Sequence, residues 1–499
     1  MIDKIRYTYN FSSWLFLRAL GLIYFFAFLS LASQVLALIG SEGILPALRL
    51  IEAVGKSEGA AAPFHFPTLF WLQPNDIFLQ IICGGGIVAA LCVMSGILTA
   101  PSLFCCWLFW LSLVTIGGDF LSFQWDVLLV EAGFLGIFLA PLRLLEAPAA
   151  FFRGKVSSID FSNIVIWLYR WLLFRLMFES GFVKLRSGDP NWWGLKALDY
   201  HYFTQPLPTP LAWFADKLPE SVHAFSVVLV FVIELLLPLL MFLPRKCKLV
   251  AGGGFIFLQL LIAATGNYAY FNLLTMALAL FLIDDQFWFK KMPVNLTRWY
   301  QNFASFPEPF FKRIITGALA VLIGLLSFVN FEGTYSLPPE LQHALAPVER
   351  LNLVNSYGLF AVMTTERNEI IIEGSADGAN WKTYEFFNKP GSIDQAPPVV
   401  APFQPRLDWQ MWFAALAPAG TSPWFSNFMV RLFRNDREVL TLLKYNPFAK
   451  QPPRYLRAEL YRYEFSSWQE LFQHGHWWQR HYVGSFIPAV KNDFLDEIK

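Results

Sequence analysis

Repeated apolar runs constrain this chain more than any other feature of its sequence. About 20 apolar residues are needed for a helix to cross the hydrocarbon core of a bilayer, and only helices and closed barrels satisfy their backbone hydrogen bonds there. Nine candidate runs occur, at Trp14–Ile39, Ile77–Leu98, Leu103–Ile116, Leu121–Pro141, Ile164–Phe182, His223–Leu243, Leu249–Thr265, Ala269–Ile283 and Ile315–Val329. The pattern predicts an α-helical polytopic membrane bundle of about nine transmembrane helices over residues 1–330.

The composition excludes several classes of protein. Hydrophobic residues make up 56% of the 499 residues and charged residues 15%, whereas soluble domains carry about 25% charge. The net charge is +1, so the basic footprint of a nucleic-acid-binding protein is missing. The sequence contains no H-E-x-x-H or P-loop motif, which disfavours metalloproteases and ATPases of the familiar designs.

The cysteines and histidines do not form a recognisable metal motif. None of the five cysteines follows Cys247, and no paired C-x-x-C site or disulfide framework can be drawn. His474, His476 and His481 cluster near the end of the chain, without a cysteine or a carboxylate pair to complete a site. We therefore expect no metal site and no nucleic-acid partner.

The distribution of Lys and Arg predicts the orientation in the membrane, because cytoplasmic flanks of membrane helices are enriched in these residues. With the amino terminus in the cytoplasm, the inner loops hold Arg143, Arg153, Lys155, Arg245, Lys246, Lys248, Lys290, Lys291, Arg298, Lys312 and Arg313. An odd number of spans then places residues 331–499 outside the cytoplasm. That side is the ER lumen of a eukaryote, or the periplasm or exterior of a bacterium.

Residues 331–499 have frequent charges, Pro-rich joints and no run long enough to span, which predicts a soluble extracytoplasmic domain of mixed α/β, β-rich character. Asp377-Gly378 lies between two β-rich segments, a strong hairpin signal. Arg454–Phe465 is expected to form another strand. Helices are expected after Asp408 and after Ser422-Pro423, because Asp and Ser favour the position that caps a helix.

Seven charged residues interrupt the apolar runs: Arg18, Asp126, Glu131, Arg170, Arg175, Glu179 and Glu234. Each charge at the centre of a membrane helix costs about 2.5 to 3.5 kcal/mol on the insertion scale. We expect Arg175 and Glu179 to pair, since they are four residues apart. Arg18 and Arg170 are the expected partners of Asp126 and Glu131. The charges form either neutralised pairs that hold helices together or a polar cavity for catalysis or transport.

Four stretches resemble one known family in the same order along the chain. They are Phe123–Glu131, Trp171–Pro210, Glu373–Trp381 and Pro405–Phe413. The resemblance is to the lipase maturation factor family. It implies a multi-pass membrane protein, in animals of the ER, that helps secreted lipases such as lipoprotein lipase to fold or to assemble into active dimers.

A fainter resemblance covers the short stretch Gly181–Leu185, followed by Asp189 and Trp192. It is similar to a segment of vitamin K-dependent γ-carboxylase, and it implies that Lys184 is a catalytic base that works with a reduced quinone. The same lysine can instead extend its ammonium to the membrane interface.

The leading hypothesis is a maturation factor without a cofactor, whose partners are membrane lipid and a secreted lipase or other secreted client. Six aromatic residues after the fifth span are the candidate client-binding surface: Trp192, Trp193, Tyr200, Tyr202, Phe203 and Trp213. They fit apolar surface on an incompletely assembled client, or they form the aromatic belt of the membrane interface. A membrane enzyme that uses Lys184 and a transporter are the alternatives.

Overall fold

The computed structural model describes residues 8–141, 161–291, 310–332, 345 and 347–492. Within these ranges, six helices are long and apolar enough to cross a membrane. They are α1 (Asn10–Ala32), α5 (Asp76–Ser95), α6 (Thr99–Ile116), the continuous run of α13 (Glu220–Phe231), η4 (Val232–Leu236) and α14 (Leu237–Leu240), α15 (Arg245–Thr265) and α19 (Phe310–Glu332).

Helices also lie in the other three predicted spans, but each of them is too short, too highly charged or too strongly bent to count as one long apolar helix. Helix α7 (Gln124–Leu139) has only 16 residues. Helix α9 (Asn163–Arg186) is long enough, but it carries several charged side chains. Helix α16 (Phe271–Ala279), extended by η5 (Leu280–Leu282), bends by 98° into α17 (Asp285–Lys291), and the bent pair counts as a seventh span if it crosses as one unit. The count of nine transmembrane helices is therefore not confirmed.

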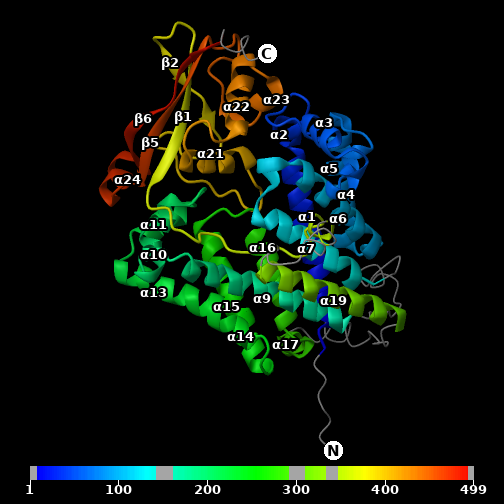
Figure 1. Cartoon of the computed structure of the whole chain (residues 1–499). Helices are drawn as coiled ribbons and strands as arrows, with labels where there is room; N and C mark the ends of the chain where they lie inside the picture. Colours follow the sequence, from blue (N-terminus) through cyan, green and yellow to red (C-terminus); the bar gives the residue numbers. More distant parts are fainter. Residues whose placement is uncertain (1–7, 142–160, 292–309, 333–344, 346, 493–499) are drawn as a thin grey trace, which may run out of the picture.

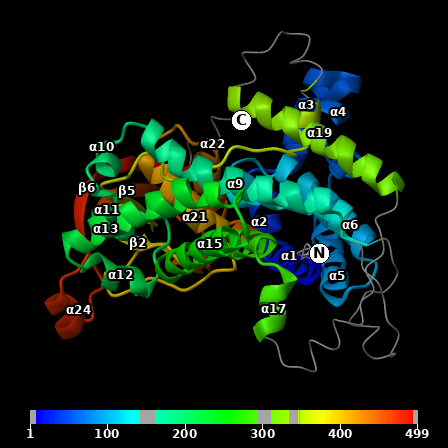
Figure 2. The same ribbon diagram turned by 90° about the horizontal axis from the view of Figure 1, so that it is seen from below.

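Helix α1 is the centre of one half of the helical region. It continues into the short α2 (Val35–Ile39), and it packs against α5, α6, α7 and α16. Figure 2 shows α5 and α6 on one side of α1, with α13 and α15 on the other. The small helices α3 (Ala47–Glu58) and α4 (Ala62–His65) lie beside the first group.

The carboxy-terminal domain is built on an antiparallel four-stranded sheet in the order β2-β1-β5-β6 (Figure 1). Its strands are β1 (Arg367–Ser375), β2 (Trp381–Thr383), β5 (Tyr455–Phe465) and β6 (Trp478–Lys491). The predicted hairpin at Asp377-Gly378 and the predicted strand in Arg454–Phe465 are confirmed. A second, two-stranded sheet pairs β3 (Glu385–Phe386) with β4 (Leu443–Tyr445).

Four helices accompany these sheets: α21 (Arg406–Leu416), α22 (Pro423–Arg434), α23 (Arg437–Leu440) and α24 (Trp468–His474). Helix α21 starts two residues before Asp408, so the prediction that Asp408 caps it is wrong. The Asp408 carboxylate instead accepts hydrogen bonds from the backbone N–H groups of Asn388 and Lys389. Ser422 precedes α22 as predicted, although its side chain makes no capping hydrogen bond.

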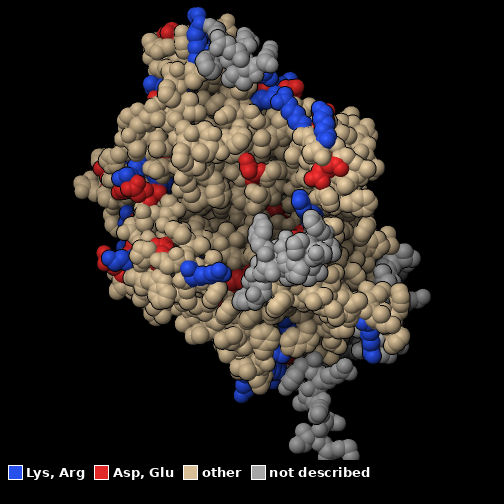
Figure 3. All heavy atoms as spheres, viewed as in Figure 1, with Lys and Arg blue, Asp and Glu red and all other residues tan. Residues whose placement is uncertain are grey.

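Three short helices connect α9 to α13: α10 (Pro190–Trp193), α11 (Ala197–Thr204) and α12 (Pro210–Asp216). Helices α10 and α11 lie below the carboxy-terminal sheet in Figure 1. Helix α21 lies between that sheet and the helical region. Figure 3 shows isolated groups of charged side chains separated by broad uncharged areas. Such a surface fits a chain whose outer helix faces contact lipid.

Candidate functional site

An ion pair buried between the two parts of the chain joins Asp126, in the first turn of α7, to Arg406, the first residue of α21. The two guanidinium Nη atoms of Arg406 each lie 2.9 Å from an oxygen of the Asp126 carboxylate. The Tyr270 hydroxyl donates to the same carboxylate at 2.8 Å. Both charged side chains are almost fully buried. This bidentate geometry, with an additional donor, compensates for the loss of hydration.

A second buried network surrounds Glu131 on α7. Arg175 on α9 forms an ion pair with Glu131, and it also donates to the Asn355 carbonyl at 2.9 Å. Glu131 accepts from the Tyr357 hydroxyl at 2.8 Å, and Glu179 accepts from the Tyr357 backbone N–H at 2.9 Å. The network therefore holds the segment that precedes β1 against α7 and α9.

These contacts correct the predicted ion pairs. Arg175 pairs with Glu131 rather than with Glu179, because the carboxylate on the neighbouring helix lies in front of its guanidinium. The prediction of Arg18 and Arg170 as partners of the two α7 acids is also wrong. Arg18 donates to the Thr99 hydroxyl, and Arg170 donates to the Phe281 carbonyl and lies over the Tyr9 ring.

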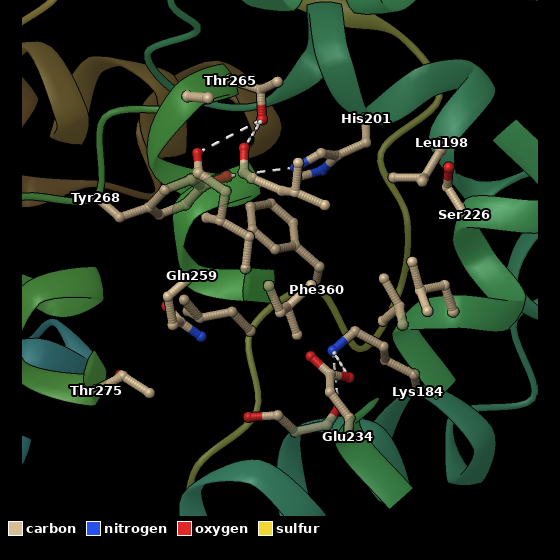
Figure 4. Close-up of a pocket in the computed structure, with 18 of the residues that line it drawn as sticks. Lys184, Leu198, His201, Ser226, Glu234, Gln259, Thr265, Tyr268, Thr275 and Phe360 are labelled. Carbon is tan, nitrogen blue, oxygen red and sulfur yellow. Dashed lines mark hydrogen bonds and ion pairs between the residues drawn. The ribbon is translucent and has the colours of Figure 1, made fainter. Parts of the chain in front are cut away.

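A cavity of about 330 Å³ lies between α9, α11, α13, α15 and the loop at Leu359–Phe360. Lys184 and Glu234 face each other at its edge (Figure 4), with the Lys184 Nζ 2.8 Å from a Glu234 oxygen. The ammonium also donates to the Ser180 carbonyl at 2.9 Å. Glu234 lies in η4, a single π-helical turn, and such turns often occur at functional positions in longer helices.

Other polar groups reach the cavity from α11, from α15 and from the residues that follow it (Figure 4). The Tyr268 hydroxyl donates to the Gln205 side chain at 3.0 Å. Loss of hydration around His201 and the positive charge of Lys184 lower the pKa of His201 to about 4. Gln259 is only 4% exposed, and its Oε1 atom has no hydrogen-bond partner among the described residues.

The structure separates the six aromatic residues predicted to bind a client. Trp192 and Trp213 are buried, so their assignment to an exposed surface is wrong. Trp192 donates to the Phe360 carbonyl, and Trp213 packs on Trp468 of the carboxy-terminal domain, so this domain covers both rings. Trp193 is 63% exposed, and the remaining three are partly buried: Tyr200, Tyr202 and Phe203.

Several residues of these networks were not assigned to a site by the sequence prediction. Arg406 stands in the stretch that resembles the lipase maturation factors, which is the signal that could have found it. Arg367 on β1 is fully buried, bonds to Glu369 at 2.7 Å and donates to the carbonyls of Phe203 and Pro206 at the end of α11.

No group of His, Cys, Asp or Glu suited to hold a metal ion occurs among the described residues.

Comparisons with known proteins match both parts of the chain. Residues 11–290 match the lipase maturation factor transmembrane domain, and residues 353–488 match the lipase maturation factor C-terminal domain. No solved structure matches the chain.

Relatives from animals match nearly the whole length. Lipase maturation factor 2 of Gallus gallus is 36% identical over 95% of this chain and 81% of the relative. Lipase maturation factor 2 of Homo sapiens is 37% identical over 95% of this chain and 82% of the relative. Lipase maturation factor 1 of Homo sapiens is 34% identical over 97% of this chain and 88% of the relative. The chain therefore belongs to the lipase maturation factor family.

Proposed function

We propose that this chain is a membrane maturation factor that assists the folding or assembly of secreted lipases. The observation that carries the proposal is the similarity of 95–97% of the chain to proteins named lipase maturation factors. The two buried charge networks support it, since they hold the carboxy-terminal domain against the membrane helices as one working unit. The proposal includes no cofactor.

The proposed location follows from the distribution of positive charge. The amino terminus lies in the cytoplasm and the carboxy-terminal domain lies outside it. This location is the ER membrane in a eukaryotic cell and the cytoplasmic membrane in a bacterium. The partners are a secreted lipase or other secreted client and the surrounding membrane lipid, with no nucleic acid.

The proposed client surface is centred on Trp193. Its ring is exposed on α10, and the partly buried Tyr200, Tyr202 and Phe203 stand on the following helix, α11. Exposed aromatic rings bind apolar surface with little loss of side-chain entropy, because an aromatic side chain has few rotatable bonds. This surface would cover apolar areas that the client buries only after it has assembled.

The geometry around Lys184 favours a structural pair over a catalytic base. Its ammonium donates to Glu234 and to the Ser180 carbonyl and lies 5.4 Å from the centre of the Trp192 ring. A general base needs a free lone pair within reach of a substrate proton. We propose that Lys184 and Glu234 position α9 against η4, and that the maturation activity does not require proton transfer by this lysine.

The function is tested in cells that lack their own maturation factor and secrete a lipase. The measured quantity is lipase activity per mass of lipase secreted, with the intact chain, with a Lys184→Met/Glu234→Met double variant or with an empty vector. The double variant removes both charges and so leaves neither one buried alone. Rescue by both forms is expected. Failure of the intact chain would overturn the maturation role, and failure of a stably folded double variant alone would restore the lysine-base hypothesis.

Client contact is tested by co-purification of the lipase with the chain. Trp193→Ala is expected to reduce the captured lipase by about fivefold or more, which corresponds to the loss of one well-buried aromatic contact. Phe64→Ala is the matched control, because Phe64 is also an exposed aromatic residue, in the short helix α4, which is proposed to lie on the same side of the membrane. Equal capture by the two variants would exclude Trp193 from the client surface.

A further inference from the structure

The cavity beside Lys184 has a mainly apolar wall. Leucine, isoleucine and valine side chains from α9, α13 and α15 form most of it, including Leu176, Leu229, Val230, Leu258 and Ile262, and Phe360 adds an aromatic ring from the loop before β1. Its volume of about 330 Å³ lies at the lower end of the range for ligand pockets in proteins, about 300 to 1,000 Å³. The space therefore suits one apolar chain rather than a lipid with two chains.

The cavity has exposed apolar lining residues at two helices that are candidate membrane spans. Two lining residues, Leu218 before α13 and Leu261 on α15, are 46% and 45% exposed. Both lie at or next to candidate membrane spans, and only 28% of the residues in each of these two spans are buried. An exposed apolar face on such a span contacts acyl chains. A membrane lipid can thus reach the cavity without passing through water.

The polar groups at the inner wall carry no net charge. Lys184 and Glu234 neutralise each other. The imidazole of His201, whose pKa is lowered to about 4 by loss of hydration and by Lys184, is neutral near pH 7. The other polar side chains of the lining are uncharged: Ser180, Tyr202, Ser226, Gln259, Thr265, Tyr268 and Thr275. A charged head group would lose its hydration there without an unpaired opposite charge to compensate, whereas a neutral one would not. The Gln259 amide projects toward the cavity in Figure 4, and its buried Oε1 atom has no described partner, so this side chain is available to rotate and accept a hydrogen bond.

We propose that this cavity binds a neutral single-chain lipid whose head group carries hydroxyl groups, with the chain between α13 and α15 and the head group at Gln259 and the Lys184–Glu234 pair. Trp193, the centre of the proposed client surface, does not line the cavity, although Tyr202 does. Lipid binding at this site requires no client protein, so its test does not depend on the proposed maturation role.

The test uses the full-length chain purified in detergent micelles. The probe is a monoacylglycerol with a diazirine in its acyl chain and a terminal alkyne for detection. Matched probes are the free fatty acid of the same chain and a two-chain phosphatidylcholine. Saturable labelling by the monoacylglycerol is expected, displaced by unlabelled monoacylglycerol, with labelled peptides from α9, α13 and α15. Equal labelling by the other two probes, or labelling confined to outer helix faces, would overturn the proposal.

A pair of variants on α13 tests the position of the ligand. Leu229→Trp places an indole in the cavity, and it is expected to reduce labelling by about tenfold, equivalent to about 1.4 kcal/mol of binding free energy. Val228→Trp is the control, because Val228 is exposed on the same helix and does not line the cavity. Undiminished labelling of a Leu229→Trp protein with an unchanged unfolding temperature would refute the site. If this variant does not fold, the peptides labelled in the unmodified chain decide the question.

Gln259→Leu tests the head-group contact, since leucine has a similar volume and no amide. The expected result is a loss of preference for monoacylglycerol over fatty acid, by about fivefold or more, while labelling by the fatty acid stays the same. An unchanged preference would show that the amide does not bind the head group, and it would overturn that part of the assignment.

Discussion

Buried charged side chains in this protein act as pairs with defined partners. Asp126 is bound by Arg406, and Glu131 is bound by Arg175 and Tyr357. Of the two interpretations that the sequence left open, these pairs match the structural one, in which neutralised charges hold segments together. Lys184 and Glu234 differ, because the same neutral pairing takes place at the wall of a cavity.

Removal of one partner from the Asp126–Arg406 pair is expected to be strongly destabilising. Arg406→Leu leaves the Asp126 carboxylate buried without its counter-charge, which costs about 3 to 5 kcal/mol. The expected result is a lower temperature of thermal unfolding for the purified protein. The double variant Asp126→Asn/Arg406→Leu is expected to recover part of the loss, because it leaves no buried charge.

An exposed pair in the carboxy-terminal domain is the matched control. Arg462 and Glu366 form an ion pair in which both side chains are well exposed, and such a pair contributes at most about 1 kcal/mol. Arg462→Leu is therefore expected to change the unfolding temperature little. A similar loss for Arg462→Leu and Arg406→Leu would contradict the role of burial.

His201 is expected to make stability depend on pH. Its pKa is about 4 in the folded chain, and the pKa of an unfolded histidine is about 6.5. On acidification the unfolded state binds the proton first, so the free energy of unfolding falls as the pH drops from about 6.5 to about 4, by up to about 3 kcal/mol. This contribution is fully present above pH 6.5.

The measurement compares unfolding temperatures at pH 7.5 and pH 4.5 for the intact chain, for His201→Gln and for His474→Gln. His474 is exposed and serves as the control. The His201 variant is expected to lose less stability on acidification than the other two proteins. An equal loss in all three would assign the pH dependence to other groups.

At the level of elements, close helix packing depends on small residues at particular positions. A Cβ atom at Gly86 on α5 would lie 2.4 Å from the Phe28 ring on α1, whereas a Cβ at Gly84 would meet nothing within 4 Å. Both glycines belong to the same Gly-Gly-Gly triplet. The local sequence therefore does not distinguish them, and the position of α1 does.

Gly86→Ala is expected to destabilise the protein by about 1 to 3 kcal/mol, because the added methyl group forces α1 and α5 apart. Gly84→Ala is expected to be neutral or stabilising by up to about 1 kcal/mol, since alanine favours a helix over glycine. Thermal unfolding of the two variants in the same detergent checks this. If the contact between Gly86 and Phe28 matters, the two variants change the unfolding temperature in opposite directions. Equal changes would indicate that the substitutions act through helix propensity alone.

The elements themselves follow largely from local pattern. Apolar runs predicted the positions of the membrane-region helices, and Asp377-Gly378 predicted the hairpin between β1 and β2. The start of α21 was missed because the capping signal at Asp408 competes with a tertiary role, in which this carboxylate accepts hydrogen bonds from the Asn388 and Lys389 backbone. A residue that serves two structural purposes cannot be assigned from its local sequence alone.

For the molecule as a whole, the orientation in the membrane is open to a direct test in eukaryotic cells. Lys382→Thr converts Asn380-Trp381-Lys382 into an acceptor for N-linked glycan at the exposed tip of the β1–β2 hairpin. If the carboxy-terminal domain faces the lumen, the variant is expected to gain one glycan that an endoglycosidase removes.

The control for this shift in mobility is Asn380→Gln combined with Lys382→Thr, which removes the acceptor asparagine. A glycan on the single variant and none on the double variant would place the domain in the lumen. Absence of glycan from a folded Lys382→Thr protein would reverse the proposed orientation.

The boundary between the two parts was predicted at residue 330 from the end of the last apolar run. The matched family domains are separated by a stretch that contains this point, residues 291–352. The boundary itself remains a prediction, as do the number of spans and the side of the membrane. Composition changes sharply there, but it does not show which helices cross the bilayer completely.

The sequence by itself determined the membrane class, the approximate helix positions, the hairpin and the family, because hydrophobic periodicity, turn chemistry and family motifs are local properties of the chain. Only the tertiary structure decided which charges pair, which aromatic rings are exposed and where a cavity remains. Asp126 and Arg406 are 280 residues apart, and Trp213 is buried by Trp468 from a different domain. Contacts of this kind depend on how distant segments pack, so their residues are visible in the sequence while their partners are not.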